Sequence, residues 1–188
     1  MLLAIEKVNA DSKSYNGWTP LWAAAANGHE GLLLAREKVN ADSKDNEYGQ
    51  MALLWAAING HEGIIKLLLA TEKVNVKSKD SRGRIPLLYV TRNEYGGIIK
   101  LLLVIEKVNV DSKYNTSRTP LLYATKSGNN TNIKLLLSIN RVNINLVNYY
   151  NSILLFIIAR TGYKEKLALL LFQSNALNIP DNFGRTLL

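Results

Sequence analysis

The chain of 188 residues repeats itself with a period near 34 residues, and this periodicity constrains its fold more than any other feature. The string Glu-Lys-Val-Asn at residues 6–9 returns at 37–40, 72–75 and 106–109. A unit this short cannot bury an apolar face alone, so its core forms only where neighbouring units stack. The sequence therefore predicts an array of stacked repeats.

Three further blocks recur in phase with the first one. A Thr-Pro-Leu block at 19–21 returns intact at 119–121, and an Asn-Gly-His-Glu block at 27–30 returns at 59–62. A block rich in Ile and Leu occupies residues 64–69, 98–103, 133–137 and 167–171. The order of the blocks predicts a helix, a turn, a second helix and an extended polar loop in each unit.

Residues that start and stop helices support this prediction. Thr before Pro suits the start of a helix, as at Thr19 and Thr119. Glycines stand where the first helix should end in a left-handed residue, namely Gly28, Gly60, Gly128 and Gly162. Glu94 replaces this glycine in the third repeat, which should lower the stability of the fold by on the order of 1 kcal/mol.

In these four blocks and their spacing, essentially the whole chain resembles the ankyrin repeat family. The resemblance implies an all-α solenoid of helix-turn-helix units joined by β-hairpin-like loops. It also implies binding of other proteins through the concave side, without catalysis. Units such as the one at 59–75 are similar to the near-identical arrays of filamentous fungi, which often end large NTPase-containing receptors.

The expected organisation is a single array over residues 1–188. Its boundaries are a partial repeat at 1–10, five repeats at 11–41, 42–76, 77–110, 111–144 and 145–179, and the start of a truncated sixth repeat at 180–188. The ragged ends fit two alternatives, a piece of a longer array and an imperfect gene model.

Three departures from the family pattern weaken this array. Trp22 occupies the place of the family's histidine after Pro-Leu, and three residues are missing from the second helix of the first repeat, after Gly31. The loop of the second repeat gains one residue near 46–48.

Composition and motifs exclude several classes of function. The absence of Cys excludes disulfides and thiolate metal sites, and the longest apolar run, 51–58, is far short of the roughly 20 residues that span a membrane. No phosphate-binding loop is present, and His29 and His61 occupy equivalent turn positions that indicate a structural role. We therefore expect no enzyme, metal, cofactor, small-molecule substrate or membrane association. The N-terminus lacks a secretion signal, which favours an intracellular protein, cytoplasmic or nuclear. We also expect a monomer.

Side chains at the expected concave positions suggest a binding surface. The aromatic members are Trp18, Trp55, Tyr89 and Tyr123, and the basic members are Arg84, Arg92, Arg118, Lys126 and Arg160. Aromatic and Arg side chains commonly anchor protein interfaces, and the formal charge of +8 favours an acidic partner. We expect the rings of Trp55 and Tyr89 to be exposed, so that replacing both by Ala leaves the fold intact. Five tyrosines should border this surface, namely Tyr15, Tyr48, Tyr114, Tyr149 and Tyr150.

Other readings remain open. Rows of basic residues such as Lys66, Lys100 and Lys134 could bind nucleic acid, although a solvated face with weak ion pairs explains them better. Duplicated repeats also copy surface residues whether or not those residues bind anything. The chain could then be a decayed fragment without a function of its own.

Overall fold

The computed structural model describes residues 9, 11–33, 39–71, 74–114, 118–139, 142–143 and 168. The chain divides into two compact units, Met1–Val108 and Asn109–Leu188. Three predicted parts of the array lie wholly or almost wholly outside the described residues: the partial repeats at 1–10 and 180–188, and the fifth repeat at 145–179. Tyr149, Tyr150, Arg160 and Gly162 belong to that fifth repeat.

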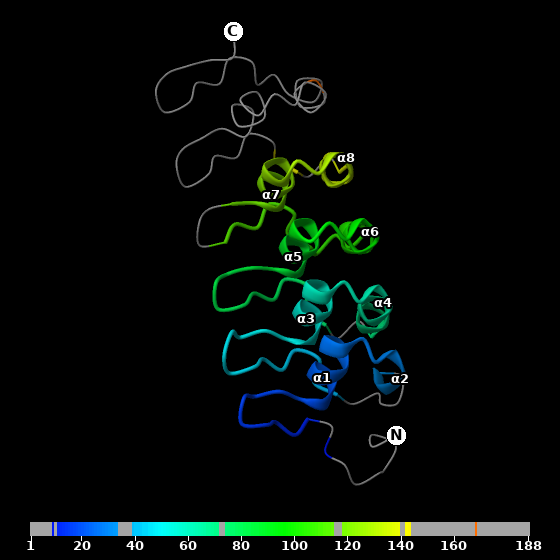
Figure 1. The fold of residues 1–188 in the computed structure, drawn as a ribbon, viewed down its shortest axis with the longest axis vertical. Helices are drawn as coiled ribbons and strands as arrows, with labels where there is room; N and C mark the ends of the chain where they lie inside the picture. Colours follow the sequence, from blue (N-terminus) through cyan, green and yellow to red (C-terminus); the bar gives the residue numbers. More distant parts are fainter. Residues whose placement is uncertain are drawn as a thin grey trace. The chain divides into compact units, whose positions relative to one another are not determined.

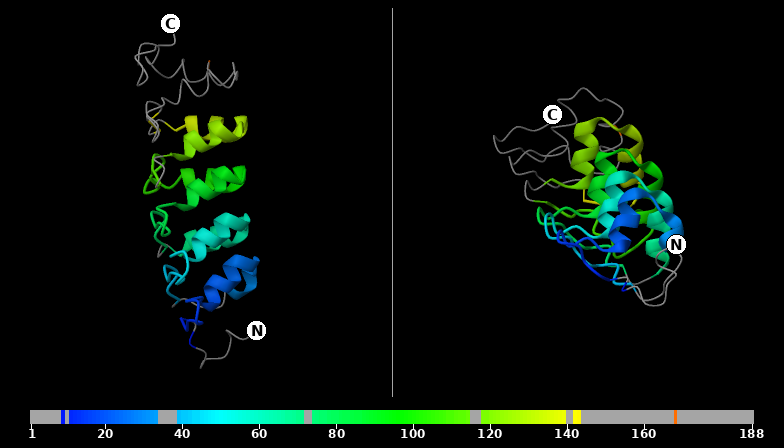
Figure 2. Two further views of the ribbon diagram at one scale, coloured as in Figure 1. Left: turned by 60° about the vertical axis from the view of Figure 1, so that its left-hand side comes forward. Right: turned by 60° about the horizontal axis from the view of Figure 1, so that its bottom comes forward.

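The first unit contains three pairs of short helices. The pairs are α1 (Pro20–Asn27) with α2 (Glu30–Leu33), α3 (Ala52–Asn59) with α4 (Glu62–Ala70), and α5 (Pro86–Arg92) with α6 (Gly96–Leu103). Helices α1, α3 and α5 stack in one row, and α2, α4 and α6 stack beside them in a second row (Figure 1). The loops project beyond the row of α1, α3 and α5, as the turned views also show (Figure 2).

The second unit contains a fourth pair of the same kind. Helix α7 (Pro120–Ser127) packs against α8 (Asn130–Leu137). Over the residues that the structure describes, helices are the only regular elements, and turns and irregular segments connect them. The predicted all-α architecture of paired helices is therefore confirmed.

The core lies between the two rows of helices. Side chains such as Leu53 and Leu54 on α3 and Ile64, Ile65 and Leu68 on α4 are at most 1% exposed. Burying a Leu or Ile side chain contributes about 1.5–3 kcal/mol, so each of these side chains adds substantially to the stability of the first unit. This burial fixes the positions from which the loops project.

The helices begin as their cap residues predict. The hydroxyl oxygens of Thr19 and Thr119 accept hydrogen bonds from the backbone N–H groups of Trp22 and Leu122, at 3.1 and 3.3 Å. Met51 and Ile85 occupy the same place before α3 and α5 and make no side-chain cap hydrogen bond. Both apolar residues are instead buried, so their positions are held by packing.

The first helices end in left-handed residues, as predicted. Gly28, Gly60 and Gly128 have φ of 75°, 75° and 78°, and Glu94 has φ of 67°. A side chain with a Cβ is strained in this region, whereas glycine is not. Glu94 is the non-glycine residue with positive φ in the described part of the chain.

Glu94→Gly is therefore expected to stabilise the protein. Relief of the left-handed strain, less the extra freedom of glycine in the unfolded chain, leaves a gain of about 0.5–1 kcal/mol. Urea unfolding followed by circular dichroism measures the change. Gly128→Ala is the opposite control, because it introduces the same strain, and it should destabilise. Equal or lower stability of Glu94→Gly would contradict this assignment.

Contacts between neighbouring repeats explain the Asn-Gly-His block. The amides of Asn59 and Asn93 each donate a 2.8 Å hydrogen bond to a backbone carbonyl of the preceding repeat, that of Ala26 or Ile58. The His61 ring lies over Gly28, and its Nε2 atom is 3.1 Å from the same Ala26 carbonyl oxygen. Both side chains therefore join consecutive repeats. The structural role predicted for His61 is confirmed, but it acts on the preceding repeat.

Candidate protein-interaction surface

Each loop is closed by a hydrogen bond between the backbone atoms of its first and last residues. The donor N–H and acceptor C=O groups belong to the pairs Ser14–Trp18, Asp45–Gln50 and Asp80–Arg84 in the first unit, and Tyr114–Arg118 in the second unit. The loop of the second repeat spans one residue more than the others, which confirms the predicted insertion. We call these segments hairpins, although they contain no strands.

Asp45 organises the hairpin of the second repeat from the inside. Its carboxylate accepts hydrogen bonds from the backbone N–H groups of Glu47, Tyr48 and Gln50, at 3.1, 2.7 and 3.3 Å. It also accepts a 3.3 Å hydrogen bond from the indole Nε1 of Trp55 on α3. Because Asp45 is buried, its negative charge is used within the protein.

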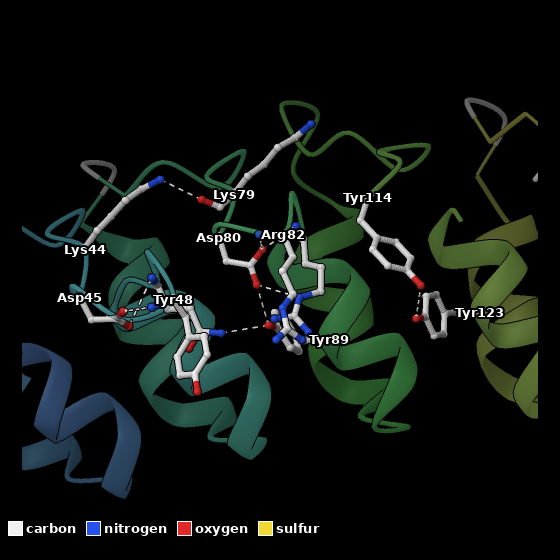
Figure 3. A network of polar contacts seen from close by, with 11 residues as sticks. Lys44, Asp45, Tyr48, Lys79, Asp80, Arg82, Tyr89, Tyr114 and Tyr123 are labelled. Atoms are coloured by element: carbon white, nitrogen blue, oxygen red, sulfur yellow. Dashed lines mark hydrogen bonds and ion pairs between the residues drawn. The ribbon is translucent and has the colours of Figure 1, made fainter. Parts of the chain in front are cut away.

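Asp80 has the same role in the third repeat, with stronger partners (Figure 3). Its carboxylate accepts backbone hydrogen bonds from Arg82 and Arg84, a 2.7 Å hydrogen bond from the Arg84 Nε and a 2.8 Å hydrogen bond from the Tyr89 hydroxyl. The Gln50 amide donates to the same hydroxyl at 2.9 Å, which joins the second and third repeats.

The titration of this cluster reflects its burial and its hydrogen bonds. Burial disfavours the carboxylate of Asp80, but the hydrogen bonds from Arg84 and Tyr89 outweigh it and hold the pKa of Asp80 below its usual value. Burial, with the neighbouring Asp80 carboxylate, raises the pKa of Tyr89 well above its usual range. Tyr89 therefore remains a neutral hydrogen-bond donor at physiological pH.

The second unit carries a related contact without a carboxylate. The hydroxyl oxygens of Tyr114 and Tyr123 are 2.6 Å apart (Figure 3), and the Arg118 guanidinium lies 6.0 Å from the centre of the Tyr123 ring. Burial and the Tyr114 hydroxyl raise the pKa of Tyr123, and Arg118 opposes this shift. The helix residue again contacts the first residue of its own hairpin.

The structure corrects the predicted exposure of Tyr89. Its side chain is 7% exposed, and its hydroxyl is held by Asp80 and Gln50. The prediction that Tyr89→Ala, made together with Trp55→Ala, leaves the fold intact is therefore wrong. Arg84 is also engaged, because its guanidinium pairs with Asp80 and lies 4.8 Å from the Tyr89 ring centre. Sequence spacing carried no information on the hairpin carboxylate that covers Tyr89.

The other predicted residues are more accessible. Trp55, Tyr123 and Arg118 are half-buried, and Arg92 and Lys126 are exposed. Trp18 is 38% exposed and stacks on Trp22 with ring centres 4.4 Å apart and planes at 3°. The edge of Trp22 in turn packs on Trp55, with centres 5.0 Å apart. Trp18 is thus the outer member of a tryptophan cluster.

Aromatic exposure in the first unit is concentrated on the hairpins. Tyr15 is 98% exposed and Tyr48 is 37% exposed, alongside Trp18. Tyr15 and Tyr48 were expected only to border the binding surface, but their rings are more accessible than those of Trp55 and Tyr89. The exposed aromatic surface therefore lies on the hairpins and not on the helix row.

The charges on the hairpins are sorted by sign. Asp11 and Asp42 accept hydrogen bonds of 2.8 and 2.9 Å from the backbone N–H groups of Asn40 and Asn75, which lie 29 and 33 residues further along the chain. The Lys44 ammonium donates to the Lys79 carbonyl oxygen at 2.8 Å and remains exposed. Most hairpin carboxylates thus satisfy internal donors, whereas the cationic groups face solvent.

We define the hairpin edge as the exposed cationic and aromatic side chains in or directly before the first unit's hairpins. Its members are Lys13, Lys44 and Lys79, each directly before a hairpin, and Tyr15, Trp18, Tyr48 and Arg82 within the hairpins. Glu47 is an exposed acidic residue on the same hairpins, so the surface is predominantly but not purely basic.

The described residues hold no group of three His, Cys, Asp or Glu side chains arranged for a metal ion. Among the same residues, no helix combines the length and the apolar character needed to cross a bilayer.

Comparisons with known proteins agree with this architecture. The family profile "Ankyrin repeats (3 copies)" matches residues 1–80, 31–112 and 64–148. The structure resembles that titled "Crystal structure of the ankyrin repeat domain of Bcl-3: a unique member of the IkappaB protein family", with a TM-score of 0.86. That match has 19% identity and covers 98% of this chain and 82% of the other, so it supports the fold alone. Curated protein sequences gave no significant match. Ankyrin repeats are generally non-catalytic protein-interaction modules, and the chain belongs to the ankyrin repeat family.

Proposed function

We propose that the chain binds a protein partner, without catalysis, and that the partner presents an acidic segment to the hairpin edge. The observation that carries this proposal is the sorting of charge on the hairpins. Asp45 and Asp80 are buried and hydrogen-bonded within their own hairpins, while Lys13, Lys44 and Arg82 are exposed. The surface that a partner meets is therefore positive and attracts carboxylates.

The exposed rings supply the apolar part of the interaction. Trp18 is held flat against Trp22, so little rotamer freedom remains to be lost when a partner packs on its outer face. Tyr15 and Tyr48 offer a ring and a hydroxyl each on the neighbouring turns. Rigid aromatic residues beside cations are the usual anchors of protein interfaces.

Accessible residues of the predicted helix row extend the proposed surface within the first unit. Arg92 and the half-buried Trp55 belong to the first unit, and Tyr123 and Lys126 offer the same chemistry in the second unit. Tyr89 and Arg84 support the surface from within and do not reach the partner.

The wider context is proposed from resemblance. Similarity to the arrays of filamentous fungi suggests that this chain is the recognition part of a larger intracellular signalling protein. In that setting, the array would act as a monomer, and catalytic functions would belong to other domains.

A peptide-display selection against the full chain tests the acidic partner. We expect enrichment of peptides that combine several Asp or Glu residues with an aromatic or aliphatic residue. Enrichment of basic peptides would contradict the proposal. So would the enrichment of no peptide beyond the level seen on a support without the protein. The control is the same selection against the Arg82→Glu variant, which should no longer enrich acidic peptides.

A salt titration separates this proposal from nucleic-acid binding. The affinity for a single-stranded oligonucleotide should be weak and should fall steeply as salt rises, because phosphate binding releases counterions. The selected peptide should retain measurable binding at the same salt concentrations through its apolar contacts. Tighter binding of the oligonucleotide than of every selected peptide would favour the nucleic-acid function.

A further inference from the structure

Three Asn-Gly dipeptides in the first unit share a sequence and differ in their surroundings. They are Asn16-Gly17 in a hairpin, and Asn27-Gly28 and Asn59-Gly60 at the ends of α1 and α3. All three asparagines are exposed, and all three glycines have positive φ, between 75° and 78°. Neither exposure nor glycine conformation therefore distinguishes them.

The asparagine side chains make different contacts. The amide nitrogen of Asn27 donates a 2.8 Å hydrogen bond to the Ala23 carbonyl, and that of Asn59 donates a 2.8 Å hydrogen bond to the Ala26 carbonyl. Among the residues that the structure describes, the amide of Asn16 has no hydrogen-bond partner. Its side chain is therefore free to turn toward the backbone that follows it.

The backbone N–H groups of the three glycines also differ in how much structure must break before their nitrogen atoms are free. The Gly17 N–H donates to the Ser14 carbonyl oxygen at 2.9 Å, within a hairpin turn. The Gly28 and Gly60 N–H groups donate to the Ala24 and Ala56 carbonyl oxygens and terminate helices. Freeing the Gly17 nitrogen breaks one turn hydrogen bond, whereas freeing the other two also frays a packed helix end.

We propose that Asn16 is a site of spontaneous deamidation, whereas Asn27 and Asn59 are protected by their amide hydrogen bonds. The deprotonated backbone nitrogen of Gly17 attacks the side-chain carbonyl carbon of Asn16. The new C–N bond closes a succinimide ring as the bond to Nδ2 breaks, and ammonia leaves with the proton. Water then opens either imide carbonyl to give aspartate or isoaspartate.

The product alters the hairpin edge in two ways. A carboxylate appears between Tyr15 and Trp18, two members of the hairpin edge. Isoaspartate also adds a methylene group to the backbone of a turn whose Asn16 carbonyl oxygen accepts a 2.9 Å hydrogen bond from the Asn46 N–H. Resting on the proposed function, we infer that this modification gradually reduces binding of an acidic partner.

Peptide mapping by mass spectrometry tests the site directly, without any binding measurement. The full chain is incubated at mildly alkaline pH, folded or in urea, and conversion at the three asparagines is followed over time. In the folded chain, Asn16 should convert at least roughly fivefold faster than Asn27 or Asn59, the factor that one net amide hydrogen bond supplies. In urea, the three rates should come together.

Equal rates at the three sites in the folded chain would overturn the proposal, as would a ranking that persists in urea. The absence of conversion at Asn16 while the unfolded chain converts would also overturn it. Asn16→Gln should remove the reaction at this turn without changing the other two sites. A separate binding assay of Asn16→Asp then measures the effect on the partner, so failure of the proposed function is distinguishable.

Discussion

Replacing Asp80 by alanine is expected to lower the free energy of unfolding by about 3 kcal/mol. The carboxylate closes its own hairpin, pairs with Arg84 and holds the hydroxyl of Tyr89. Removing it leaves a guanidinium that is largely buried and a buried hydroxyl without their acceptor. Urea unfolding of the variant and of the unmodified chain measures the difference.

The matched control is Asp42→Ala, because Asp42 is only half-buried and bonds a single backbone N–H, that of Asn75. Its expected cost is about 1 kcal/mol. Equal effects of the two substitutions would contradict the role assigned to the Asp80 cluster.

Acidity provides a second readout of the same cluster through Asp80→Asn. The folded-state pKa of Asp80 lies below the ordinary value of 3.8, so its ionisation stabilises the fold. This contribution is fully present above pH 3.8 and is lost as pH falls through the folded-state pKa. The stability difference between the unmodified chain and Asp80→Asn should therefore shrink below pH 3.8. A difference that grows on acidification would contradict the assignment.

Arg82→Glu is expected to weaken binding of a selected acidic peptide about tenfold, since repulsion replaces attraction across the interface. The Arg82 side chain is exposed on the hairpin edge, and its backbone N–H supplies the contact to Asp80. The substitution should therefore change the dissociation constant more than the stability. Isothermal titration calorimetry with the display-selected peptide gives the ratio.

Lys100→Glu provides the matched control, because it makes the same change in net charge at an exposed position on α6. We expect it to weaken binding much less than Arg82→Glu does. Equal losses of peptide affinity from both substitutions would show that only the net charge of the chain matters, and would contradict binding at the hairpin edge.

The sequence predicted the fold because several helix signals recur in phase with the period of the repeats. Thr19 and Thr119 cap helices, and Gly28, Gly60 and Gly128 end them in the left-handed region, as their residue types require. The strained Glu94 was also predictable, because only glycine avoids a penalty at that position.

The binding surface was predicted less well, for a physical reason. Periodicity assigned Tyr89 to the exposed helix face but carried no information on which hairpin group would reach its hydroxyl. A signal was available in hindsight, because Asp45 and Asp80 stand ten and nine residues before Trp55 and Tyr89. The one-residue difference matches the longer hairpin of the second repeat. A carboxylate at this distance places the aromatic edge inside the protein.

Chemical-shift mapping of the ¹⁵N-labelled chain with a selected acidic peptide tests the central claim most directly. We expect saturable chemical-shift changes at the Trp18 indole N–H and at backbone amides in the hairpins at 44–50 and 79–84. The Trp22 indole, which is buried, should move much less. Shifts concentrated on the amides of α4 and α6, with those hairpins unchanged, would contradict it.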